Sequence, residues 1–165
     1  MKHAARSIAV SQMVALSFGV AAILGPATQV QATETHHTVV SGDAVNWGPA
    51  PPSLPPGAQA ASLLGSPAKE GPFVLRLKFP AGFIVPPHRH SKDEFVTVIS
   101  GKFAIASGEK VDRASLKSLP PASFVHLPAG MPHYAWAEAE TVVQINGMGP
   151  FDVKYVDPKD DPRNK

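Results

Sequence analysis

Short strand-like runs separated by glycine, proline or charged residues most restrict how this chain can fold. From Phe73 to Phe79, four apolar residues at every second position alternate with Val74, Arg76 and Lys78, a period of two that is typical of a β-strand. Further runs with strand character lie at 95–100, 102–107, 123–127, 134–137, 141–146 and 151–156. Residues 112–119 are expected to form one helical turn or a loop. The absence of a helical period predicts an all-β sandwich or small barrel.

The N-terminus has the pattern of an export signal. Lys2 and Arg6 precede a largely apolar, uncharged stretch at 8–24, and Val30–Ala32 supplies the small residues of a cleavage site. We therefore predict a signal peptide over residues 1–32 and an exported protein, periplasmic or secreted, with no stable membrane insertion after cleavage. The alternative is a retained membrane anchor, for which the apolar stretch is marginal against the roughly 20 residues that a spanning helix needs.

The charge of the chain changes once this signal is removed. The full sequence has 15 basic and 13 acidic residues, but Lys2 and Arg6 belong to the signal, so the remainder is neutral. A neutral chain gives no support for a nucleic-acid partner or an anionic membrane surface. The sequence contains no cysteine, which excludes disulfides, thiolate metal sites and a cysteine nucleophile.

Three regions follow the predicted signal. Residues 33–72 form a proline-rich N-terminal segment, expected to run extended over the domain surface with Trp47 and Leu54 as anchors; a flexible leader is the alternative. Residues 73–156 contain the strand-like runs and are assigned to the barrel. Residues 157–165 are charged and contain proline, which favours a frayed tail.

A group of metal-ligand residue types lies between two of the predicted strands. His88 and His90 are two residues apart, so an extended chain directs both side chains to one face. Pro86–Pro87 stiffens the approach to this pair. Residues 91–93 are expected to form a turn that returns Glu94 beside the histidines. Two imidazoles and one carboxylate on one face are typical of non-haem metal sites with open positions.

A second fragment offers a third imidazole. The turn-forming sequence Pro128-Ala-Gly130 is followed by Pro132 and His133, so proline fixes the backbone just before the histidine. On the strand that follows, His133, Ala135 and Ala137 share one face. If His133 faces a cavity, small neighbours leave room there for a ligand.

Together these fragments resemble the two motifs of the cupin family. The first, Gly-x5-His-x-His-x3-Glu-x6-Gly, matches residues 82–101 at every defined position. The second resembles residues 122–137, with Ala122 in place of the usual glycine and Ala137 in place of the usual asparagine. The resemblance implies a double-stranded β-helix, the jelly-roll cupin barrel. It also implies four metal ligands: His88, His90, Glu94 and His133.

Other polar residues near these motifs receive weaker assignments. His126 lies in a strand-like run without a motif role, and either an indirect contact with the site or a place in the cavity is left open. The pair His36–His37 is assigned to the leader. Arg89 and Asp93, inside the first motif, are expected to face solvent.

The implied ligand set suits one divalent transition metal, and iron, manganese, nickel, cobalt, copper and zinc all stay open. Two functions are compatible with the resemblance. One is a metal-dependent dioxygenase acting on a small enol, diketone or aromatic substrate, with Glu94 as a catalytic base. The other is a non-catalytic, metal-dependent module that binds or senses a small molecule. A homodimer also stays open, since cupins commonly dimerise.

Overall fold

A computed structural model describes residues 37–165 of the chain. The predicted signal peptide at 1–32 lies outside the described residues, as does His36. Residues 37–165 form one compact unit by themselves. Across this described part, no helix is long and apolar enough to cross a membrane.

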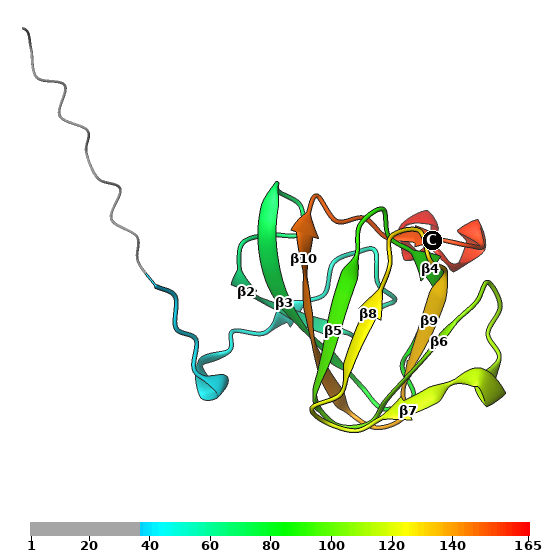
Figure 1. Cartoon of the computed structure of the whole chain (residues 1–165), viewed down its shortest axis with the longest axis horizontal. Coiled ribbons are helices and arrows are strands. Elements are labelled where there is room, and N and C mark those ends of the chain that lie inside the picture. The colour runs from blue at the N-terminus through cyan, green and yellow to red at the C-terminus, as the bar shows by residue number, and fades with distance from the viewer. Residues whose placement is uncertain (1–36) are drawn as a thin grey trace, which may run out of the picture. The chain divides into compact units, whose positions relative to one another are not determined.

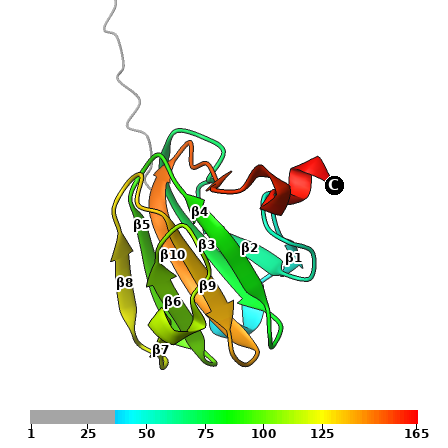
Figure 2. The ribbon, with the colours of Figure 1, turned by 90° about the vertical axis from the view of Figure 1, so that its right-hand side faces the viewer.

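Two antiparallel sheets face each other (Figures 1 and 2). The six-stranded sheet has the order β1 (Gly48–Pro49), β2 (Gln59–Leu64), β3 (Gly71–Phe79), β10 (Thr141–Gly149), β5 (Glu94–Ser100) and β8 (Phe124–Leu127). The five-stranded sheet has the order β11 (Lys154–Tyr155), β4 (Ile84–Arg89), β9 (His133–Ala137), β6 (Phe103–Ser107) and β7 (Lys117–Leu119). From β3 to β6 the chain changes sheet at every step. The predicted all-β jelly roll is therefore confirmed.

The positions of most strands agree with the sequence patterns, and the differences are local. Strand β2 lies inside the segment predicted to be proline-rich and extended, and it pairs with β3. The strand pairing thus begins at Gly48 on β1, ahead of the predicted start of the barrel at residue 73. Only Ala61 of β2 is fully buried. The two leucines of this strand, Leu63 and Leu64, are adjacent and not buried, so no alternation of large apolar side chains marks it. Residues 112–119 contain both a 3₁₀ helix, Arg113–Ser115, and the short strand β7.

The C-terminal residues are attached to the domain. Residues 157–165, expected to fray, contain the 3₁₀ helices Pro158–Asp160 and Pro162–Asn164. The Arg163 guanidinium donates to the carbonyl of Val153 at 2.8 Å and also pairs with Asp161. These contacts hold the tail beside β11.

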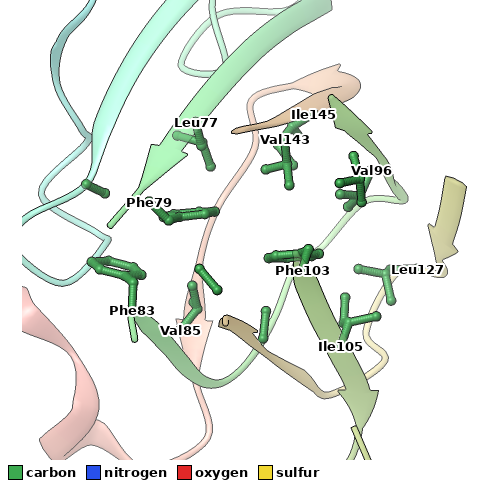
Figure 3. Close-up of a cluster of buried hydrophobic side chains, with 14 of the residues drawn as sticks. Leu77, Phe79, Phe83, Val85, Val96, Phe103, Ile105, Leu127, Val143 and Ile145 are labelled. Atoms are coloured by element: carbon green, nitrogen blue, oxygen red, sulfur yellow. The ribbon is translucent and has the colours of Figure 1, made fainter. Parts of the chain in front are cut away.

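Apolar side chains from both sheets meet between them (Figure 3). Phe79 is central, because its ring stacks on Phe83 at 4.9 Å and on Phe103 at 6.2 Å between centroids. Aliphatic residues of the other strands surround these rings, including Val96, Val143 and Ile145. Burial of these side chains is the main stabilising contribution to the fold, and the same walls continue into the cavity described below.

Candidate metal centre

Three chain segments bring the predicted ligand residues together. His88 lies on β4, His90 follows that strand directly, and Glu94 begins β5 after the predicted turn at 91–93. His133 begins β9 and is the register partner of His88 in the β4–β9 pair. All four side chains are buried, with 2–8% of each residue exposed. Proteins seldom bury four such groups unless the groups are paired or hold a ligand.

Backbone carbonyls orient each imidazole in the same way. The Nδ1 atom of His88 lies 2.7 Å from the carbonyl oxygen of Pro86, and that of His133 lies 3.0 Å from that of Met131. The Nδ1 atom of His90 lies 2.5 Å from the carbonyl oxygen of Asp152. Since a carbonyl accepts, each Nδ1 carries the proton and donates it. Each Nε2 atom then keeps a free lone pair, the tautomer that a metal-binding histidine needs.

The free nitrogens converge beside a carboxylate. One ring nitrogen from each of His88, His90 and His133 lies within 4.8 Å of the other two. Glu94 Oε2 lies 3.3 Å from Nε2 of His90 and 3.3 Å from Nε2 of His133. The Nε2 atom of His90 is buried without a hydrogen-bond partner among the described residues. Several electron-pair donors with no proton donor between them fit a bound cation, so this group could hold a metal ion.

The pKa values of His88 and Glu94 agree with a cation site, whereas that of His90 is raised: burial opposes its charged form, but the neighbouring Glu94 and the Asp152 carbonyl outweigh burial. Burial, reinforced by the neighbouring His133 and His90, lowers the pKa of His88 to about 3, so this ring is neutral at physiological pH. Burial opposes ionisation of Glu94, but the adjacent His133 and His90 imidazoles outweigh burial and hold the pKa of Glu94 well below its usual range. His88 and Glu94 therefore have the protonation states that metal binding requires, a neutral imidazole and an ionised carboxylate.

The remaining predicted polar residues lie outside this group. His126 is exposed, and its ring stacks on Phe95 at 5.0 Å while Nε2 contacts the Asp93 carboxylate at 3.0 Å. The second Asp93 oxygen accepts from the backbone N–H of Ala129 at 2.9 Å. This pair ties the 91–93 turn to the loop after β8 and does not reach the cavity. Arg89 pairs with Glu109 at the surface, at 2.8 Å.

Sequence reasoning missed the residues that support His90. The Phe151 ring stacks on the His90 imidazole at 4.3 Å, and the Asp152 carbonyl accepts its Nδ1 proton. The Asp152 carboxylate accepts from the Ser91 backbone N–H at 2.7 Å and from its hydroxyl at 2.8 Å. Burial would raise the pKa of Asp152, but the hydrogen bonds from Ser91 and the contact with Lys154 outweigh it and lower that pKa to about 2. No sequence signal marked these contacts, because Phe151 and Asp152 lie far along the chain from both motifs.

The three histidines and Glu94 line an otherwise apolar cavity. Its volume is about 270 Å³, and its walls come from strands of both sheets and from the segments around Leu54 and Phe151. Ala135, on the predicted His133 face, contributes to the wall, whereas Ala137 packs in the core. Within the described chain, no lysine or arginine lines the cavity. The centre can therefore present one polar surface to a small, mainly apolar molecule.

Comparison with solved structures defines the class of protein. The chain is similar to an RmlC-like cupin from Shewanella frigidimarina, with a TM-score of 0.53 and 14% identity over 69% of this chain and 91% of that one. It is also similar to an acetylacetone dioxygenase from Acinetobacter johnsonii, with a TM-score of 0.59 and 19% identity over 79% and 84% of the two chains. The polyketide cyclase RemF from Streptomyces resistomycificus has a TM-score of 0.59 and 15% identity over 77% and 90%. At these identities the likeness shows the fold alone, and the fold is that of a cupin.

The family is identified by a match over most of the chain. The model described as a domain of unknown function, DUF4437, matches residues 38–165. The chain thus belongs to the DUF4437 family. Among proteins of curated function, none matches this sequence.

Proposed function

We propose that this protein is an exported, metal-dependent cupin enzyme, a dioxygenase that acts on a small enol, diketone or aromatic substrate. The observation that carries the proposal is the convergence of three buried imidazoles on one ionised carboxylate at the surface of an apolar cavity. His88, His90, Glu94 and His133 would hold one divalent transition metal, whose identity is open among iron, manganese, nickel, cobalt, copper and zinc.

The protein's own groups supply binding and proton transfer. A bound divalent metal with open positions would act as a Lewis acid and bring an oxygen-donor substrate and dioxygen together. Glu94, whose side chain lines the cavity, would be the group that accepts the proton of an enol. The carbonyls of Pro86, Met131 and Asp152 hold the imidazole rings in place. The apolar walls exclude water from the reacting groups.

The likeness to an acetylacetone dioxygenase supports a diketone or enol substrate, but the fold alone does not select the reaction. The polyketide cyclase has the same TM-score as the dioxygenase. One fold supports many reactions, so oxygen chemistry is proposed from the donor set and the apolar cavity.

One observation favours a second candidate, a non-catalytic module that binds or senses a small molecule. Among the described residues, the three histidines and Glu94 are the ionisable groups that line the cavity. If all four hold the metal, no separate acid or base remains for chemistry on the ligand. Such a site would bind a small molecule without turnover.

Dioxygen uptake separates these candidates. Metal-loaded protein is mixed with a panel of flavonols, catechols and β-diketones, and uptake is measured together with substrate loss. Uptake that depends on protein and metal supports the enzyme, and saturable binding without uptake supports the sensor. Glu94→Gln should abolish uptake, whereas Glu109→Gln, at an exposed carboxyl, should leave it unchanged.

Export has an independent test. The N-terminus of protein recovered outside the cytoplasm is determined by mass spectrometry. A chain that begins at Thr33 supports cleavage of residues 1–32. Membrane-bound protein that keeps these residues would support the retained membrane anchor instead. Elemental analysis of the same material identifies the metal that is bound in that compartment.

A further inference from the structure

One part of the cavity wall is a loop. The chain between β1 and β2 contributes Pro51, Ser53 and Leu54 to the lining, and half-buried Leu54 packs against the apolar core. Strands β1 and β2 form one edge of the six-stranded sheet, while β11 and β4 form an edge of the five-stranded sheet. In Figure 2 these two edges lie on the same side of the domain.

Hydrogen bonds fix this loop across the two edges. The N–H of Ala50 donates to the Ala58 carbonyl at 3.3 Å and closes the base of the loop, and the N–H of Leu54 donates to the Pro51 carbonyl at 2.9 Å. The Tyr155 hydroxyl donates to the Ser53 carbonyl at 2.7 Å. Tyr155 belongs to β11 and is the register partner of His88. One hydrogen bond therefore joins the loop that carries Leu54 to the strands that carry the metal centre.

The lining has a second property that affects which ligands can enter. Apart from the three histidines, Glu94 and Ser53, the residues around the cavity are apolar. A second ionised group on a ligand would lie against these walls without a counter-charge or a set of hydrogen-bond donors. Burying a charge under such conditions is strongly unfavourable.

We propose that Leu54 is a specificity-determining residue of this cavity. Its side chain limits the size of the ligand, and the apolar walls admit only molecules that are uncharged beyond the polar end facing the histidines. This inference rests on the proposed function, because the polar end of the ligand is taken to lie at His88, His90 and His133. The cavity volume of about 270 Å³ is that of roughly nine water molecules, which gives room for a ligand of on the order of ten non-hydrogen atoms.

Binding of three related molecules tests the proposal. Catechol, protocatechuate and para-butylcatechol share the same pair of adjacent hydroxyls, but the second adds a carboxylate and the third adds an apolar chain. Affinities are measured by calorimetry, without oxygen, for cobalt-loaded and metal-free protein. We expect catechol to bind and protocatechuate to bind about a hundredfold more weakly. Butylcatechol should bind the native protein more weakly than catechol, because its alkyl chain would meet the Leu54 side of the wall.

Variants assign the size limit to Leu54. Leu54→Ala should strengthen butylcatechol binding by about tenfold or more, since the removed carbons leave room for the alkyl chain, and Leu54→Trp should weaken catechol binding. Leu64→Ala is the matched control, because Leu64 is an exposed leucine of β2 away from the cavity. Tyr155→Phe leaves the wall intact, removes the hydrogen bond to Ser53, and should give an intermediate affinity for butylcatechol.

The results distinguish this inference from the proposed function. Equal affinity for catechol and protocatechuate, or an unchanged butylcatechol affinity in both Leu54→Ala and Tyr155→Phe, would overturn the inference. Cobalt content is measured on the same samples. Protein that retains no cobalt counts against the proposed metal function, and the effects of ligand size and charge are then measured on metal-free protein alone.

Discussion

The two motif segments reach the same geometry with different residues. In the first, Gly82 and Gly101 have φ angles of 81° and 85°, the left-handed region that favours glycine. In the second, Gly130 has a φ of 78°, while Ala122 adopts 67° although it is not a glycine. Both segments deliver buried histidines to one site. The comparison shows that the fold preserves a backbone conformation even where the residue type that favours it is absent.

The largest effect is expected where a glycine is needed for space as well as for conformation. A Cβ atom at position 101 would lie 2.1 Å from the Glu140 carbonyl oxygen and 2.7 Å from Thr141 Cα. Because both neighbours are backbone, Gly101→Ala should lower the free energy of unfolding by about 3 kcal/mol. Urea denaturation of the purified protein measures this change.

Gly82→Ala and Gly130→Ala are the controls for that prediction. A Cβ atom at either position meets nothing within 4 Å, so only the left-handed conformation is penalised. Each substitution should cost about 1 kcal/mol. A loss at Gly101 no larger than that at Gly82 would show that the close approach to Glu140 has no energetic weight.

The next largest effect is a loss of bound metal, which tests whether the second motif contributes as much to the metal centre as the first. If His133 is a ligand, His133→Ala should lower bound metal by about tenfold or more in elemental analysis, and His88→Ala should do the same. His126→Ala removes an exposed histidine outside the cavity and should leave the metal content unchanged. Full metal retention by His133→Ala would remove His133 from the ligand set and leave the first motif to hold the metal alone.

Much of the fold followed from residue patterns, and the exceptions have a physical reason. The strand at Phe73–Phe79 was predictable because large apolar side chains alternate along it. Strand β2 was not, because Ala61 is its fully buried residue and alanine marks no face strongly. The tail at 157–165 was expected to fray, but it is attached to the domain. A charged sequence does not reveal that the Arg163 guanidinium donates to the Val153 carbonyl.

The candidate site also has a part that was predictable from the sequence and a part that was not. The four ligand types were predictable because they lie at short, defined spacings within two segments. Their supports were not, because these come together only when the barrel closes. The Asp152 carbonyl that orients His90 is 62 residues from it, and the Ser53 carbonyl that Tyr155 binds is 102 residues from Tyr155. Local patterns do not determine contacts over such separations.

Substitution of Asp152 tests one of these long-range contacts, the one beside His90 of the first motif. Asp152→Ala removes the carboxylate that accepts from the backbone N–H and hydroxyl of Ser91, next to His90. We expect the free energy of unfolding to fall by about 1 kcal/mol, and metal affinity to fall by less than in His133→Ala. Both are measured on the same protein, by denaturation and by metal titration. Glu70→Ala, at an exposed position, is the control, and equal behaviour of the two variants would show that the Ser91 contacts do not support the site.

The smallest expected change in the free energy of unfolding is at Ala122, where the substitution should stabilise the protein. Ala122 lies in a turn where its N–H donates to the Val98 carbonyl at 2.9 Å, and its left-handed φ of 67° costs an alanine about 1–2 kcal/mol. Glycine would relieve this strain but would lose about 0.5–1 kcal/mol through the greater freedom of the unfolded chain. Ala122→Gly should therefore raise the free energy of unfolding by about 0.5 kcal/mol. Ala129→Gly, at an exposed alanine whose φ is not positive, should lower it by about as much. If both substitutions destabilise the protein equally, the turn at Ala122 is not strained, and the two motifs differ in sequence without differing in energy.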